Sequence, residues 1–173
     1  MPQVRRRPAR DEADSYYYRY IDRIDNDDVL AVLESQLAES ARFLGAIAEE
    51  KTLHSYAPGK WTIRQVVNHI SDCERLFVGR AFWFARGFDS VLPSFSSDLS
   101  AEAAGANGVA WKAHLEEFDA VRRSTLSFFR NLPDEAWDRT GKTVEYPFTV
   151  RSLAYIAAGH FDHHRAILQE RYL

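Results

Sequence analysis

The sequence predicts an all-α protein built as a four-helix bundle. Four stretches of about 20 residues repeat their apolar residues with the period of an amphipathic helix. No stretch shows a convincing alternation of apolar and polar residues, which a half-buried strand would require. A chain of 173 residues with 46% apolar and 27% charged residues has the size and composition of one globular domain.

The first two predicted helices lie in the first half of the chain. One extends over about residues 26–50, with Asp27 and Asp28 near its positive end. The second opens with TIRQ, a capping box in which Thr62 is the N-cap and Gln65 follows three residues later. It extends to about residue 84, and Gly87 closes it.

The other two predicted helices lie in the second half. Residues 87–108 form a long polar connection with room for a short helical turn. The third helix covers about 109–132 and Pro133 marks its exit. The loop 140–148 is expected to contain some extended structure around Val144–Tyr146, and Thr149 caps a fourth helix that extends nearly to residue 173.

The ends and the overall charge narrow the choice of function. Residues 1–15 are rich in Arg, Asp, Glu and Pro, which predicts a flexible arm ahead of a single domain at 16–173. The net charge of −3 and the lack of a basic stripe argue against nucleic-acid binding. The chain has one cysteine, no apolar run behind its N-terminal arginines and no membrane-length apolar run. We therefore expect a cytoplasmic protein.

Three of the six histidines fall within AGHFDHHRAIL, residues 158–168. On a helical wheel His160 and His164 lie in the middle of the apolar stripe, whereas His163 lies roughly 80° away on the flank. An inward i, i+4 pair of imidazoles can share a metal ion, but it can also be two core histidines with hydrogen-bond partners. The stripe itself consists of Leu153, Ile156, Ala157, Ile167 and Leu168.

A third ligand is available on the second helix. His69 lies at the edge of the stripe that contains Val66 and Ile70, and facing helices of a bundle can bring such residues together. Three histidine ligands leave coordination positions open, which is typical of a catalytic rather than a structural site. His69, His160 and His164 are therefore the candidate metal ligands, and zinc, nickel or iron are the ions expected.

The remaining polar residues receive no site role. His54 and His114 are expected to face solvent, His163 to lie at a surface or interface or behind the ligands, and Cys73 to pack as a small buried residue. Asp72 and Glu74 are expected to be exposed on the helix flank, so neither is expected to act as a general base. Three arginines on the second helix could anchor a carboxylate but are expected to be solvated: Arg64, Arg75 and Arg80.

Several motifs resemble the DinB family of metal-binding four-helix proteins, also called YfiT-like. The most specific are PGKW at 58–61, the histidine of NHI at 68–70, and GHFDHH at 159–164, and the similarity extends from about Asp27 to the end. The resemblance implies an up-down-down-up bundle, a divalent metal held by His69, His160 and His164, and a homodimer. It also implies, for some members, transfer of a low-molecular-weight thiol such as bacillithiol, mycothiol or glutathione.

The sequence thus leaves three functions open. In the first, the metal activates a small thiol that attacks an electrophilic small molecule in detoxification. In the second, the protein is a hydrolase that uses a metal-bound water. In the third, the chain is a non-catalytic metal-binding stress protein. None of these implies a nucleic-acid or membrane partner.

Overall fold

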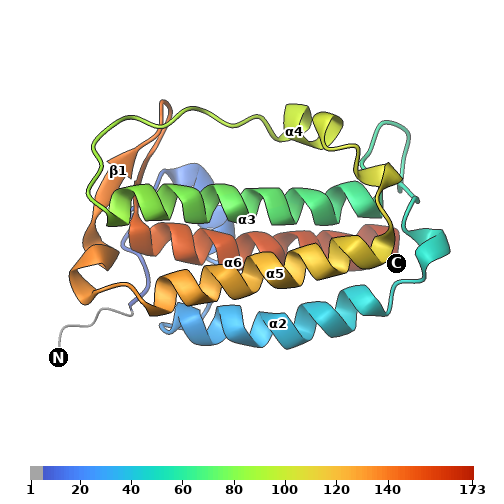
Figure 1. The fold of residues 1–173 in the computed structure, drawn as a ribbon, viewed down its shortest axis with the longest axis horizontal. Helices are drawn as coiled ribbons and strands as arrows, with labels where there is room; N and C mark the ends of the chain where they lie inside the picture. The colour runs from blue at the N-terminus through green and yellow to red at the C-terminus, as the bar shows by residue number, and fades with distance from the viewer. Residues whose placement is uncertain (1–5) are drawn as a thin grey trace.

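Four long helices form the frame of the molecule. In the computed structural model, which describes residues 6–173, they are α2 (Val29–Gly45), α3 (Ile63–Ala85), α5 (Trp111–Arg130) and α6 (Val150–Ile167). Figure 1 shows α2 and α6 running in one direction along the bundle and α3 and α5 in the other. The protein is therefore the four-helix bundle that the helical patterns predict, with the up-down-down-up topology that the family resemblance implies.

A long crossover follows from this topology. Since α3 and α5 run in the same direction, the chain must travel back along the bundle between them, and residues 86–110 do so across one face (Figure 1). The crossover contains α4 (Ser97–Ala103) and a 3₁₀ turn at Ala106–Gly108. The short helical turn expected there is thus α4.

Side-chain caps fix where the two site-bearing helices begin. Thr62 accepts a hydrogen bond from the Gln65 backbone, and the Gln65 side chain accepts one from the Thr62 backbone at 3.0 Å. Thr149 forms the same reciprocal pair with Ser152 at the start of α6. Because a helix has 3.6 residues per turn, fixing its first residue also fixes the direction of every histidine that follows.

A buried polar network connects the four helices. The Arg122 guanidinium of α5 donates two hydrogen bonds of 2.8 Å to the Glu74 carboxylate of α3. It donates a third to the Gln36 side-chain oxygen of α2, and the Gln36 amide donates to the carbonyl of Ala158 in α6 at 3.0 Å. Glu74 is 1% exposed, so the expectation that it lies on an exposed flank was wrong, while Asp72 is half-buried. The reason is a partner 48 residues away that neutralises its charge.

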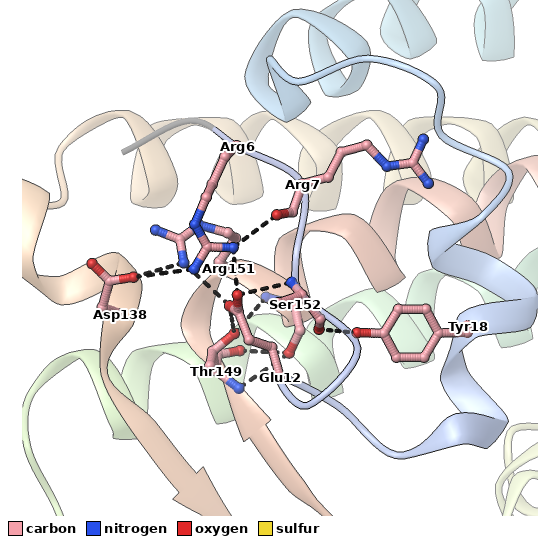
Figure 2. A network of polar contacts seen from close by, with 9 residues as sticks. Arg6, Arg7, Glu12, Tyr18, Asp138, Thr149, Arg151 and Ser152 are labelled. Atoms are coloured by element: carbon pink, nitrogen blue, oxygen red, sulfur yellow. Dashed lines mark hydrogen bonds and ion pairs between the residues drawn. The ribbon is translucent and has the colours of Figure 1, made fainter. Parts of the chain in front are cut away.

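The N-terminal segment is also part of the packed structure. Residues 1–5 of the expected arm lie outside the described residues, but residues 6–15 lie against the start of α6 (Figure 2). The Glu12 carboxylate, 8% exposed, accepts hydrogen bonds from the Thr149 hydroxyl at 2.9 Å and from Arg151 at 3.1 Å. Arg151 also donates to Asp138 at 2.7 Å. This segment therefore supplies the carboxylate that a buried arginine requires, which a free arm would not.

A short hairpin leads directly into α6. Strands β1 (Thr140–Lys142) and β2 (Pro147–Thr149) pair antiparallel. Extended structure was expected at Val144–Tyr146, but these residues form the turn, in which the Thr143 amide donates to the Tyr146 carbonyl at 2.8 Å. The other short elements are η1 (Ser15–Tyr17), α1 (Tyr18–Ile21), η2 (Glu49–Lys51), η4 (Asp134–Asp138) and a terminal π-helical turn, η5 (Leu168–Tyr172).

Among residues 6–173, no helix combines the length and the hydropathy needed to cross a lipid bilayer.

We predict that Glu74→Gln lowers the free energy of unfolding by about 3–5 kcal/mol, because it leaves the Arg122 charge buried without a counter-charge. Urea denaturation followed by circular dichroism measures this change. The matched control is Asp119→Asn, which removes the exposed pair with Arg123 and should change stability far less, because water and salt screen an exposed pair. Equal effects of the two substitutions would contradict a special role for the buried pair.

Candidate metal centre

The structure brings together the three histidines that the sequence selected. His69 extends from α3, and His160 and His164 extend from consecutive turns of α6. The Nε2 atom of His160 lies 3.2 Å from the Nε2 atoms of both His69 and His164. One ring nitrogen from each of the three histidines lies within 4.8 Å of the corresponding nitrogens of the other two, so the three rings converge on one point.

This geometry fits a divalent metal ion. Two imidazole nitrogens bound to a tetrahedral zinc at 2.0–2.1 Å are about 3.4 Å apart, close to the separations found here. No carboxylate joins the three histidines in the cluster of candidate ligands within the described chain. The set therefore resembles a site with three neutral donors and open positions, which suits zinc, nickel or iron.

Burial keeps the three rings neutral in the metal-free protein. Burial lowers the pKa of His69 to about 4 and that of His164 to about 2. Burial, followed by the neighbouring histidines, lowers the pKa of His160 well below its usual value. Neutral imidazole is the form that binds a metal, so little free energy is spent on removing protons at neutral pH.

Aromatic side chains surround the three histidines. The ring of Trp61 lies 4.8 Å from that of His69, and the rings of Tyr20 and Phe77 lie 5.2 Å and 5.6 Å from that of His160. Sequence reasoning did not assign Tyr20 to the site, since it lies in a short helix outside the four periodic stretches.

The position of Tyr20 depends on Gly159. A Cβ atom at residue 159 would lie 2.0 Å from the backbone oxygen of Tyr20, so only glycine allows α1 to approach α6 this closely. Gly159 directly precedes His160. The same close approach therefore places the Tyr20 ring against His160 and also against His163, at 5.3 Å.

Cys73 lies one helical turn after His69 and is 4% exposed. Its Sγ atom is 3.5 Å from His69 Nδ1. Burial raises the pKa of the Cys73 thiol to about 12, so it is a neutral thiol in the metal-free protein. This agrees with the expected packing role.

The other histidines lie outside the cluster. His54 is exposed, as expected. His114 is not: it is 1% exposed, and its ring pairs with the Ala106 carbonyl at 2.9 Å, so the prediction of a solvent-facing residue was wrong. The crossover supplies this carbonyl, which a wheel of α5 alone cannot reveal. His163 is half-buried, and its Nδ1 atom has no hydrogen-bond partner among the described residues.

Two of the three arginines on α3 are buried rather than solvated. Arg64 donates to the Thr52 hydroxyl at 2.8 Å and to the Val109 carbonyl at 2.8 Å, which ties α3 to neighbouring loops. Arg80 is 5% exposed. Arg75 is exposed, as expected, and forms ion pairs with Asp72 and Glu117.

Two hollows reach the histidines from different sides. A cavity of about 320 Å³ includes His69, Cys73 and His160 in its wall. A second, about 260 Å³, is a groove beside His164 that includes Trp61 and Asp98. Asp98 comes from α4, and sequence reasoning missed it because only the crossover brings it near. The rest of the first wall is mainly aromatic and polar: Tyr16, Tyr17, Tyr20, Leu76, Phe77, Arg80, Phe95, Ser97, Thr143, Glu145 and Tyr146.

We predict that the metal-free protein loses stability as the pH falls from about 6.5 toward 4. The folded pKa of each clustered histidine lies below its unfolded value, so in this window the unfolded chain binds more protons and acid favours unfolding. Each ring contributes up to about 1.4 kcal/mol per pH unit. Thermal unfolding of chelator-treated protein at several pH values measures the slope.

A His160→Leu variant should show a shallower pH dependence, and a variant at the exposed histidine, His54→Asn, should match the wild type. A slope that His160→Leu leaves unchanged would contradict the assignment of the acid sensitivity to the cluster.

Comparison with known proteins places this site in a family context. The chain resembles the structure of YfiT from Bacillus subtilis, described as a probable metal-dependent hydrolase with an unusual four-helix bundle topology. The TM-score is 0.72 at 19% identity, over 82% of each chain. It also resembles a mycothiol-dependent maleylpyruvate isomerase, with a TM-score of 0.65 at 13% identity. That match covers 83% of this chain but only 61% of the isomerase. No curated protein sequence matches the chain.

At these identities the structural likenesses establish the bundle fold. The sequence adds a direct match to a family model, which covers residues 32–168. That match includes all three clustered histidines and both helices that carry them. The chain belongs to the DinB superfamily.

Proposed function

We propose that this protein is a metal-dependent transferase that joins a low-molecular-weight thiol to an electrophilic small molecule. His69, His160 and His164 would hold the divalent ion through their convergent Nε2 atoms. When bound, such an ion stabilises the thiolate form of a coordinated thiol at neutral pH.

The observation that carries the proposal is the access to the cluster from two sides. The cavity reaches His69 and His160, and the groove reaches His164. A transferase must bring two different molecules to one reacting atom, and two separate approaches meet that need. A hydrolase needs only one approach, because its second reactant is water.

The surrounding side chains support this chemistry. The rings of Tyr17, Tyr20 and Phe77 in the cavity wall can pack against the body of an electrophile, which would then displace water that competes with the thiol. Burial raises the pKa of Tyr20, so its phenol stays protonated and can donate a hydrogen bond to a developing anion. With an epoxide, an S–C bond would form, a C–O bond would break, and the proton lost by the thiol would end on the alkoxide.

One observation favours a second candidate, hydrolysis. Asp98 lies in the groove beside His164, and its charge acts on His69, which partly opposes the effect of burial on the pKa of that ring. An exposed carboxylate there could accept a proton from an attacking water. Turnover without any thiol, abolished by Asp98→Asn, would favour this function over the transferase.

The homodimer, the cytoplasmic location and a role in stress response stay predictions from the sequence. A His160→Ala variant that loses the metal yet keeps its full cellular function would favour a non-catalytic protein.

We predict that the wild-type protein binds one divalent ion per chain and that His160→Ala does not, since two remaining ligands hold an ion weakly. Elemental analysis of the purified proteins measures the metal content. His163→Ala, which removes the neighbouring ring outside the cluster, is the matched control and should retain the ion. Full occupancy in His160→Ala, or equal loss in His163→Ala, would refute the ligand assignment.

We predict that the metal-loaded protein accelerates the loss of thiol when bacillithiol, mycothiol or glutathione is mixed with chlorodinitrobenzene. A thiol-reactive dye measures the remaining thiol. His160→Ala should show only the uncatalysed background rate, and His163→Ala should retain most of the activity. A protein with a full complement of metal and no activity toward any of the three thiols would count against the transferase.

A further inference from the structure

Arg80 is a buried cation without a counter-ion. It lies on the penultimate turn of α3. Its side chain lines the cavity of about 320 Å³ and is 5% exposed. Among residues 6–173 no carboxylate lies within ion-pair distance of its guanidinium, whereas the other buried arginines of α3 and α5, Arg64 and Arg122, pair with Glu49 and Glu74. A buried charge with no partner is costly, so it calls for an explanation.

The neutral contacts of Arg80 leave part of the guanidinium unsatisfied. Its NH2 group donates to the Pro93 carbonyl at 3.3 Å, and the Phe148 ring lies 5.7 Å from its central carbon. Its Nε atom has no hydrogen-bond partner in the described structure. The guanidinium also acts on Tyr17: burial raises the pKa of that phenol, and the charge of Arg80 and a side-chain hydrogen bond with it oppose the shift. Tyr17 and Arg80 both line the cavity, so the guanidinium lies at its wall.

The cavity extends from Arg80 to the candidate metal ligands. Arg80 lies 11 residues after His69, about 16 Å along the helix axis, and helical side chains lean toward the N-terminus, which here means toward His69. Tyr17, Phe77 and Tyr146 also line this cavity. A ligand that fills this space would have an apolar or aromatic body, one end near the histidines and the other at the guanidinium.

We propose that Arg80 binds the carboxylate of a small molecule whose apolar body occupies this cavity. A guanidinium with free N–H groups matches a carboxylate in charge and shape. Glu145 also lines the cavity and is exposed, and its negative charge disfavours a doubly charged phosphate ester relative to a singly charged carboxylate. The substrate class builds on the proposed function, because it supposes that the cavity receives one of the two reactants.

Isothermal titration calorimetry tests this on the full chain as purified, and again after metal chelation. The probes are hydrocinnamate, its neutral amide and phenyl phosphate. We expect the wild type to bind hydrocinnamate about tenfold or more tightly than the amide, with or without metal. Arg80→Gln should abolish this preference. Arg75→Gln removes an exposed arginine from the same helix and should keep it.

Each alternative outcome overturns the proposal. If the wild type binds hydrocinnamate and its amide equally well, the cavity has no anion site. If it binds phenyl phosphate more tightly than hydrocinnamate, the ligand class is a phosphate ester and not a carboxylate. A preference that survives in Arg80→Gln and disappears on chelation places the carboxylate on the metal. If Arg80→Gln fails to fold, the wild-type comparison still decides, and Arg80→Lys should retain part of the preference. No thiol enters these measurements, so a lack of transferase activity and a lack of carboxylate binding are separate failures.

Discussion

The ion pair between Arg122 and Glu74 is the constraint on which the arrangement of the helices depends. Two parallel hydrogen bonds of 2.8 Å form only when α3 and α5 lie at one relative height. A slip by one helical turn, about 5.4 Å, would leave both charges buried and unpaired. Apolar packing tolerates small shifts, but this pair does not. Through Gln36 the same network extends to α2 and to the carbonyl of Ala158 in α6.

This network lies at the height of the candidate metal centre. Glu74 follows His69 by five residues, and Ala158 precedes His160 by two. The contacts that fix the register of α3 against α6 therefore also fix the separation of His69 and His160. An error of one turn in that register would separate the rings far beyond the span of a single ion. The buried charges thus serve the site without touching it.

The sequence predicted those features that depend on one helix at a time. The caps at Thr62 and Thr149 and the inward direction of His160 and His164 follow from local pattern, and the structure agrees with each. Two of the wrong expectations, those for Glu74 and His114, concerned burial that depends on partners elsewhere in the chain. A helical wheel gives the direction of a side chain but not what that side chain meets.

The same distinction explains why parts of the site were missed. Tyr20 and Asp98 lie in short elements with no periodic signal, and only the tertiary fold brings them to the histidines. Arg80 was considered as a carboxylate anchor but expected to be solvated. Its burial follows from the crossover, whose Pro93 carbonyl covers the guanidinium.

The distance along the chain between the clustered histidines has a consequence for how the protein would acquire a metal ion. His69 and His160 are separated by 91 residues, so closing the three-ligand set requires a long-range pairing of α3 with α6. Contacts of this kind form late in folding, because the intervening chain must lose its conformational freedom first. The ion would therefore not act as a template around which the chain collapses. It would enter a nearly complete bundle, and by binding only the native state it would slow unfolding.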